Sequence, residues 1–201
     1  MNLVNLYQVN IPEVTNVFCE SFYNYPVMQY VLGEKKDYDT RLRKLVTFFV
    51  SARALRKEPM LGIYNEENKL VAAAIVTLPG DIPPPAELLK QRELLWTELG
   101  SEEKTRYENY GIATSRLRPK EPHHHLNMIG VKPAYQGKGL ARKLIDKVEI
   151  SASEYPSSSG VSLDTEVESN VQFYLHLGYE LLGEKNVDKN LKTWGFFKAK
   201  Q

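Results

Sequence analysis

The sequence predicts an α/β domain in which helices flank a mixed β-sheet with a parallel central pair of strands. Its 201 residues, of which 42% are hydrophobic and 25% charged, suit one compact domain with a sizeable core. A strand, helix, strand order at residues 123–131, 138–153 and 160–167 predicts a parallel pair with a right-handed crossover. Short apolar runs elsewhere add antiparallel strands, so the sheet is expected to be mixed.

The first half of the chain is expected to begin with two helices. Apolar residues recur at three- and four-residue steps from Val14 to Tyr25, which predicts a helix that ends before Pro26. A second helix is predicted over residues 39–55, with its apolar face inward and Arg41, Arg43 and Lys44 in solvent.

A hairpin and a helical insert follow. Residues 60–64 and 70–78 are apolar and flank a polar turn, which predicts two antiparallel strands. Three prolines at 83–85 then end the sheet, and helices are predicted on either side of Gly100. The remaining predicted elements are strands at 123–131, 160–167, 179–183 and 192–198 and helices at 138–153 and 170–177.

Charge and cysteine content exclude several classes of protein. Lys and Arg total 26 and Asp and Glu total 25, so the net charge of +1 predicts no nucleic-acid or anionic-membrane partner. The single cysteine, Cys19, cannot form an intramolecular disulfide, and no basic-then-apolar signal segment opens the sequence. We therefore expect a cytoplasmic protein. The longest uncharged apolar run, residues 70–79, is too short to cross a bilayer.

The segment from Val131 to Leu144 carries the chemistry. Gly137 and Gly139 separate a predicted strand from a predicted helix, where backbone N–H groups and the helix dipole favour a phosphate. Lys132, Lys138 and Arg142 are expected to add local positive charge.

The loop does not match two common nucleotide-binding motifs. Arg142 stands where a dinucleotide-binding G-x-G-x-x-G loop needs glycine, and no P-loop string occurs. A strand-to-helix turn that uses glycine only for its geometry remains an alternative. A nucleotide-binding enzyme is a third interpretation, in which ATP or NAD would compete for the loop.

Two motifs resemble the GCN5-related N-acetyltransferase (GNAT) superfamily. Gln136, Gly139 and Ala141 match the family's acyl-CoA loop Q/R-x-x-G-x-G/A, and Val131-Lys132-Pro133 precedes it as Val-x-Pro. Asn170, Phe173-Tyr174 and Leu177-Gly178-Tyr179 match a second family block. Glu121-Pro122 and Thr193-Trp194 look further like the branch of puromycin-type acetyltransferases.

The resemblance implies a splayed sheet whose parallel strands, here 123–131 and 160–167, part to admit the pantetheine of acetyl-CoA. It implies one GNAT-like domain over residues 1–201, with a helical insert at about 83–118 and an acyl-CoA-binding core at 122–198. The co-substrate is then acetyl-CoA, with no metal. The residues expected to bind CoA are Ile129, Gly130, Val131, Gln136, Gly137, Lys138, Gly139, Leu140, Ala141, Arg142, Asn170 and Tyr174.

Two residues are expected to carry the catalysis. Tyr174, the motif tyrosine, is the predicted general acid for the leaving thiolate, although a core aromatic is the alternative interpretation. Related acetyltransferases often keep a Glu or His six positions before the last Val of the strand that corresponds to 123–131. By that resemblance His125, six positions before Val131, is the first candidate to accept the amine proton, and Glu121 and His123 are weaker candidates. Strand alternation predicts that His125 shares a face with Asn127, Ile129 and Val131.

Metal binding by His123, His124 and His125 is not expected, because consecutive strand residues alternate between faces and cannot converge on one ion. The resemblance also makes aromatic residues of the first helices candidates to roof an acceptor pocket, although periodicity favours a core position for Phe22 and Tyr25. The candidates are Phe22, Tyr23, Tyr25 and Tyr30, with Met28, and the insert adds Trp96, Tyr107 and Tyr110. The predicted function is direct acetyl transfer from acetyl-CoA to a primary amine, most simply of a small molecule. The alternative is a non-catalytic acyl-CoA-binding module. The sequence leaves open the acceptor (drug, polyamine, amino acid or protein terminus) and whether the protein is a homodimer.

Overall fold

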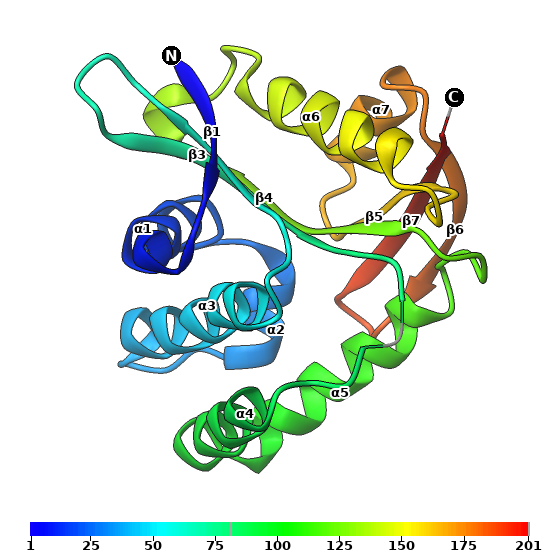
Figure 1. Ribbon diagram of the computed structural model, residues 1–201. Coiled ribbons are helices and arrows are strands. Elements are labelled where there is room, and N and C mark those ends of the chain that lie inside the picture. The colour runs from blue at the N-terminus through cyan, green and yellow to red at the C-terminus, as the bar shows by residue number, and fades with distance from the viewer. Residues whose placement is uncertain (81, 201) are drawn as a thin grey trace.

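The computed structural model describes residues 1–80 and 82–200 and contains a seven-stranded sheet (Figure 1). The strand order is β1-β2-β3-β4-β5-β7-β6, and every neighbouring pair is antiparallel apart from β4 and β5. The mixed sheet predicted from the sequence is therefore confirmed. The strands are β1 (Asn2–Leu6), β2 (Met60–Tyr64), β3 (Leu70–Thr77), β4 (His124–Val131), β5 (Gly160–Thr165), β6 (Glu180–Asn186) and β7 (Lys192–Ala199).

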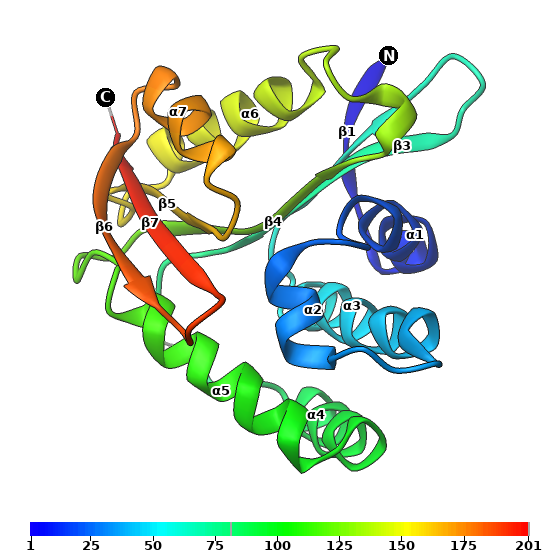
Figure 2. The same cartoon turned by 180° about the vertical axis from the view of Figure 1, so that it is seen from behind.

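Helices cover both faces of the sheet. The first three lie on one face, α6 and α7 lie on the other, and the helices of the insert extend beside the first group (Figures 1 and 2). Each face has its own apolar cluster, one including Phe18, Leu45 and Met128 and the other including Leu144 and Phe196. The helices are α1 (Ile11–Ser21), α2 (Pro26–Leu32), α3 (Tyr38–Leu55), α4 (Ala86–Leu99), α5 (Ser101–Ser115), α6 (Leu140–Glu154) and α7 (Ser169–His176), with short 3₁₀ turns η1 (Gln8–Asn10) and η2 (Pro133–Tyr135).

The parallel strands β4 and β5 are paired at only one end. Their register runs from His124 opposite Val161 to Leu126 opposite Leu163, and the rest of β4 has no partner on β5. On its other side β4 stays paired with β3 as far as Val131. The sheet is thus splayed between β4 and β5, as expected for a GNAT-like fold.

The structure adds a strand, a short 3₁₀ turn and an α-helix to the elements expected in the first half. The edge strand β1 precedes the first helix, and α2 begins at Pro26. A proline such as Pro26 indicates the end of a preceding helix, but proline also suits the first position of a new helix, where its missing N–H has no intrahelical acceptor. The expectation that two helices begin the fold was therefore wrong.

Arg41 is buried, whereas the sequence predicted it in solvent with Arg43 and Lys44, which are exposed. Its guanidinium Nη2 lies 2.7 Å from Oε1 of Glu103, a residue of α5 that is itself only 2% exposed. Lys35 Nζ contacts the same carboxylate oxygen at 2.6 Å. The packing of α4 and α5 against α3 buries Arg41, and the periodicity of α3 could not reveal that covering layer.

Candidate active site

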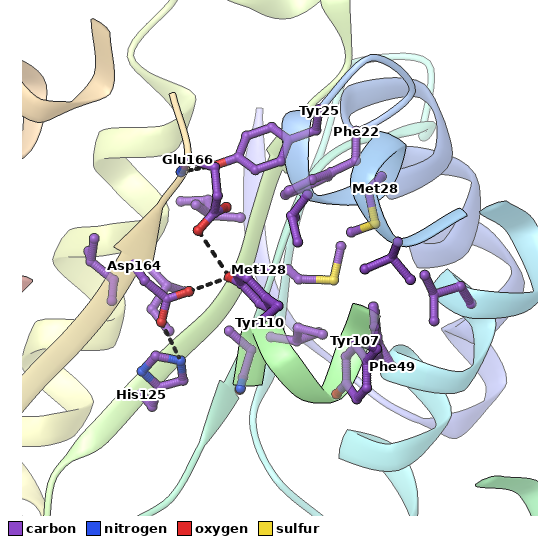
Figure 3. A pocket seen from close by; sticks show the side chains of 18 of the residues that line it. Phe22, Tyr25, Met28, Phe49, Tyr107, Tyr110, His125, Met128, Asp164 and Glu166 are labelled. Carbon is purple, nitrogen blue, oxygen red and sulfur yellow. Dashed lines mark hydrogen bonds and ion pairs between the residues drawn. The ribbon is translucent and has the colours of Figure 1, made fainter. Parts of the chain in front are cut away.

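A cavity of about 190 Å³ lies where β4 and β5 separate (Figure 3). Residues of both strands line it on one side, and residues of α2, α3 and α5 line it on the other. His125 and Tyr174, the two predicted catalytic residues, both contribute to its wall, as does Asn170. The fold thus brings these three residues to one cavity from β4 and α7.

A β-bulge in β4 decides which side chains face this cavity. Ile75 pairs with Met128 and Val76 with Leu126, so β4 has one additional residue, Asn127, at this point. Leu126 and Ile129 consequently pack in the same cluster beneath α6, while Met128 packs in the opposite one. The expectation that His125 shares a face with Ile129 and Val131 was wrong, because strict alternation does not survive a bulge.

His125 is 5% exposed and is held from two sides. Its Nδ1 lies 2.8 Å from Ser162 Oγ, and its Nε2 lies 3.5 Å from Asp164 Oδ1. Burial, with the positive charge of Arg118 nearby, holds the pKa of His125 well below its usual value, so the imidazole is neutral at neutral pH. His124 contacts Ser158 and Tyr155 instead, so the two histidines do not converge.

Two carboxyl groups near the end of β5 meet a tyrosine of the insert. The hydroxyl of Tyr110 lies 2.7 Å from Asp164 Oδ2 and 3.0 Å from Glu166 Oε1 (Figure 3). Thr193 Oγ1 donates to the same Glu166 oxygen at 2.8 Å. Burial and the nearby Asp164 raise the pKa of Glu166 to about 8. Because a phenol has one proton to donate, a protonated Glu166 satisfies both contacts of Tyr110.

Tyr174 is buried and lines the same cavity as Asp164 and Glu166. Its ring packs against Phe196 at 5.5 Å and Tyr179 at 6.0 Å between centroids. Burial, followed by the charges of Glu166 and Asp164, raises the pKa of Tyr174, which keeps the phenol protonated. The residue is both a core aromatic and part of the cavity wall, so the two interpretations from sequence are compatible.

The glycine loop presents free N–H groups. Gly137 and Gly139 both have φ of +73°, and a side chain at either position would meet no atom within 4 Å. Within the described residues, no acceptor meets the backbone N–H groups of residues 137–142, and α6 begins at Leu140. Unpaired N–H groups at the start of a helix are suited to an anion such as a phosphate or diphosphate.

The cations around the loop are less free than the sequence suggested. Lys132 pairs with Glu20 at 2.7 Å, and Arg142 pairs with Asp146 at 2.8 Å. Lys138 lies over the ring of Tyr135, 5.0 Å from its centroid. Of the three predicted cations, Lys138 is therefore the one that no carboxylate neutralises among the residues the structure describes.

Comparisons with known proteins agree with this geometry. A family model described as "acetyltransferase (GNAT) domain" matches residues 104–196. Residues 104–196 of this chain thus resemble a GNAT acetyltransferase domain. The match covers both motifs and the whole of β4 to α7, and it supports an N-acetyltransferase.

Solved structures share the fold over nearly the whole chain. A histone acetyltransferase HPA2 and related acetyltransferase from Corynebacterium glutamicum is 19% identical, with 96% of this chain and 94% of that chain covered and a TM-score of 0.73. A polyamine N-acetyltransferase of Drosophila melanogaster is 16% identical, with 98% and 100% covered and a TM-score of 0.63. An arylalkylamine N-acetyltransferase 2 from Aedes aegypti is 16% identical, with 100% and 99% covered and a TM-score of 0.63. At these identities the likeness shows a common fold.

Sequence reasoning missed two residues of this cavity, namely Asp164 and Glu166. Asp164 and Glu166 are two positions apart at the carboxyl end of a strand predicted to be parallel, and such ends line the crevices of α/β sheets. That spacing was a usable signal. Nothing local indicated that Tyr110 would contact these carboxyl groups, because it reaches them from α5, 54 positions before Asp164.

In the part of the chain that the structure describes, no helix is long and apolar enough to span a membrane. No group of three or more histidine, cysteine or acidic residues able to hold a metal ion occurs among those same residues.

Proposed function

We propose that the protein transfers an acetyl group directly from acetyl-CoA to the primary amine of a small molecule. The cavity at the divergence of β4 and β5, which contains Tyr174, His125 and the carboxyl pair, carries this proposal. The named activities of the Drosophila and Aedes structural neighbours, on polyamines and arylalkylamines, support a small amine as acceptor. As part of the same proposal, Glu121-Pro122 and Thr193-Trp194 are taken as a resemblance to puromycin-type acetyltransferases.

The binding of CoA is assigned to the splayed end of β4 and to the loop before α6. The free N–H groups of residues 137–142 receive the diphosphate, and Lys138 adds the positive charge that no carboxylate cancels there. Backbone groups of Ile129, Gly130 and Val131, which face no strand on the β5 side, hold the pantetheine arm. Asn170, whose amide donates to Thr165 at 3.1 Å, is the proposed contact from α7.

Two proton transfers accompany the reaction. His125 takes one proton from the bound ammonium, which gives the neutral nitrogen that attacks the thioester carbon. The C–N bond forms, the C–S bond breaks, and Tyr174 gives its proton to the departing sulfur. The second proton, lost from the acetylated nitrogen, then restores Tyr174, and the proton on His125 passes to solvent. The balance is one amide, one CoA thiol and one released proton.

A thiol-release assay over a panel of primary amines tests the proposal, with CoA binding measured separately by calorimetry. We expect CoA release that depends on the amine and an acetylated product of the corresponding mass. A non-catalytic acyl-CoA-binding module would bind CoA without turnover on any amine, and that result would overturn the proposed function. Competition of ATP or NAD with CoA would instead favour a nucleotide-binding enzyme.

The domain organisation and location belong to the same proposal. We assign residues 1–201 to one catalytic domain in which the insert, about residues 83–118, closes the acceptor side of the cavity while residues 122–198 bind CoA. Tyr107 and Tyr110 of α5 support this assignment, because both line the cavity beside residues of β4 and β5. We further propose that the protein acts in the cytoplasm.

A further inference from the structure

The cavity has two chemically different walls. Asp164 and Glu166 lie on the β5 side, and Phe22, Met28 and Phe49 lie on the side of the first three helices (Figure 3). The neighbouring residues Val27, Val31 and Leu45 extend the second wall with apolar surface. A ligand that fits both walls has one strongly polar end and an apolar body.

The polar wall is suited to a cation. Both carboxyl groups lie within hydrogen-bond distance of the single hydroxyl of Tyr110, so they are close to each other and largely removed from water. Two acidic groups so placed repel each other when both are ionised. A primary ammonium brings a compensating charge and three donors, so it relieves that repulsion more effectively than a neutral alcohol or amide does.

The apolar wall is rigid and aromatic. Phe22 lies 4.8 Å from Tyr25 and Phe49 lies 5.7 Å from Tyr107, measured between ring centroids, and the second pair is stacked. Aromatic side chains with few free torsions bury apolar ligand surface at little cost in conformational entropy. The body of the ligand is therefore expected to be compact and apolar.

The rest of the cavity offers no partner for a second ammonium. Among the described residues that line it, the acidic ones are Asp164 and Glu166, and Arg53 lines it as a cation. A carboxylate on the ligand would gain little attraction from Arg53, because Arg53 already pairs with Glu58 at 2.8 Å and contacts Thr77. Arg118, the other cation that lines the cavity, is likewise paired, because its Nη2 lies 3.4 Å from Asp164 Oδ1.

We infer that the acceptor is a primary monoamine on a compact apolar body with no other charge, its ammonium received by Asp164 and Glu166 and its body by the wall of Phe22, Met28 and Phe49. This inference rests on the proposed acetyl transfer and specifies its substrate class. It assigns Glu166 to substrate binding and leaves the proton acceptor and the general acid as proposed above.

Steady-state kinetics on the unmodified protein provide the first test. We would compare phenethylamine with 1,4-diaminobutane and with phenylalanine, at saturating acetyl-CoA. We expect kcat/KM for phenethylamine to exceed that for each of the others by about 100-fold, since a misplaced charge in a desolvated site is strongly disfavoured. A diamine or amino acid that matches phenethylamine overturns the inference while the acetyltransferase function stands. Absence of acetylation of every amine, despite CoA binding, refutes the function itself.

A second measurement isolates the contribution of the ammonium group to binding. Phenethylamine and 2-phenylethanol differ only in the polar end, and each can be titrated against the protein saturated with CoA, which carries no acetyl group to transfer. We expect the amine to bind at least about tenfold more tightly, the size expected for a hydrogen bond to a charged group. Equal binding of the two compounds would contradict the role given to the carboxyl pair.

The variant Glu166→Gln tests the residue assignment. The amide keeps the shape and the acceptor oxygen but removes the charge, so kcat/KM for phenethylamine should fall at least about tenfold while KM for acetyl-CoA stays the same. Glu168→Gln, two positions further along and exposed, is the matched control and should behave as wild type. An unchanged kcat/KM in folded Glu166→Gln overturns the assignment. Should that variant not fold, the comparison of amine and alcohol on the unmodified protein still decides.

Discussion

The hydroxyl of Tyr110 lies 2.7 Å from Oδ2 of Asp164, a contact that joins the helical insert to the central sheet. Tyr110 comes from α5, and Asp164 comes from β5, the strand that parts from β4. A second contact, from the same hydroxyl to Glu166 at 3.0 Å, makes one tyrosine responsible for the position of both carboxyl groups. The insert thus helps to shape the cavity as well as to cover it.

Replacement of Tyr174 by phenylalanine removes the proposed general acid. General acid catalysis contributes about 10²- to 10⁴-fold, so we expect kcat to fall by about 100-fold or more. CoA affinity should change little, because the substitution removes one hydroxyl and leaves the packing against Phe196 in place. Thiol release gives kcat, and calorimetry with CoA gives the affinity.

Tyr179→Phe is the matched control for that experiment. Tyr179 is buried in the same aromatic cluster, and its hydroxyl has no hydrogen-bond partner among the described residues. The variant should keep the wild-type kcat. Loss of activity in both variants to the same extent would attribute the effect of Tyr174→Phe to packing.

Gly139→Ala should weaken acetyl-CoA binding through the backbone. Gly139 precedes α6 with φ of +73°, a conformation that costs an L-residue about 1–2 kcal/mol. Because an added methyl group would meet no atom within 4 Å, the effect comes from strain and a shift of the N–H groups. We expect KM for acetyl-CoA to rise about tenfold with little change in KM for the amine.

Gly111→Ala provides the comparison for this glycine. Gly111 lies inside α5, where an added methyl group likewise meets nothing within 4 Å, and its φ is not positive. Alanine in a helix interior is favoured over glycine by about 1 kcal/mol, so this variant should be slightly more stable with an unchanged KM. A KM for acetyl-CoA that stays at the wild-type value in Gly139→Ala would remove the loop from CoA binding.

The pH dependence of kcat/KM for the amine should show the ionisation of Glu166. Its carboxyl group has a pKa raised to about 8 in the free protein, and only the carboxylate attracts an ammonium. Below that pH the group is protonated, so kcat/KM should rise with pH through about 8. Glu166→Gln should abolish this rise. Because both proteins are assayed with the same amine, the ionisation of the substrate affects both pH profiles equally and cancels when they are compared. A rise that persists unchanged in the variant belongs to another group.

The pH dependence of kcat should report His125 instead. Once the ammonium is bound, Glu166 is held as a carboxylate, and the remaining ionisation is that of the base. The pKa of His125 is lowered well below its ordinary value of 6.5, so kcat should fall only on the acidic side of that pH. His125→Asn should lower kcat and remove this acidic limb. An identical limb in the variant would exclude His125 as the base.

Glu103→Gln should destabilise the fold without touching the cavity. The substitution leaves buried Arg41 without its charge partner, and breaking a buried pair costs about 3–5 kcal/mol. Urea unfolding measures the loss. Glu102→Gln, at an exposed position 3.8 Å from Arg106, should cost about 0–1 kcal/mol. Equal costs for the two variants would show that the Glu103 cluster contributes no more than a surface pair.

The same cluster predicts a pH dependence of stability. The pKa of Glu103 is lowered in the folded protein, where contacts with Lys35 and Arg41 outweigh the effect of burial. A lowered folded pKa means that the stabilisation is complete above the ordinary value of 4.5 and is lost as the pH falls below it. The free energy of unfolding of Glu103→Gln should therefore depend less on pH in that acidic range than that of the wild type.

The sequence by itself determined what depends on neighbours along the chain. Periodicity and turn residues placed the hairpin, the two insert helices and the strand, helix, strand crossover within a few residues of their observed bounds. The loop from Gln136 to Arg142 could be singled out because positive φ at glycine and free N–H groups at a helix start are local properties. Tyr174 was found because its motif is contiguous.

Only the tertiary structure decided what depends on segments far apart in sequence. The bulge at Asn127 reverses the face of β4 beyond it, and it is visible only in the pairing with β3. The burial of Arg41 depends on α4 and α5, and the meeting of Glu166 with Tyr110 depends on how the insert returns to β5. Local periodicity reports which face of an element is apolar, whereas the desolvation and charge that set a carboxyl group's chemistry come from whatever packs against it.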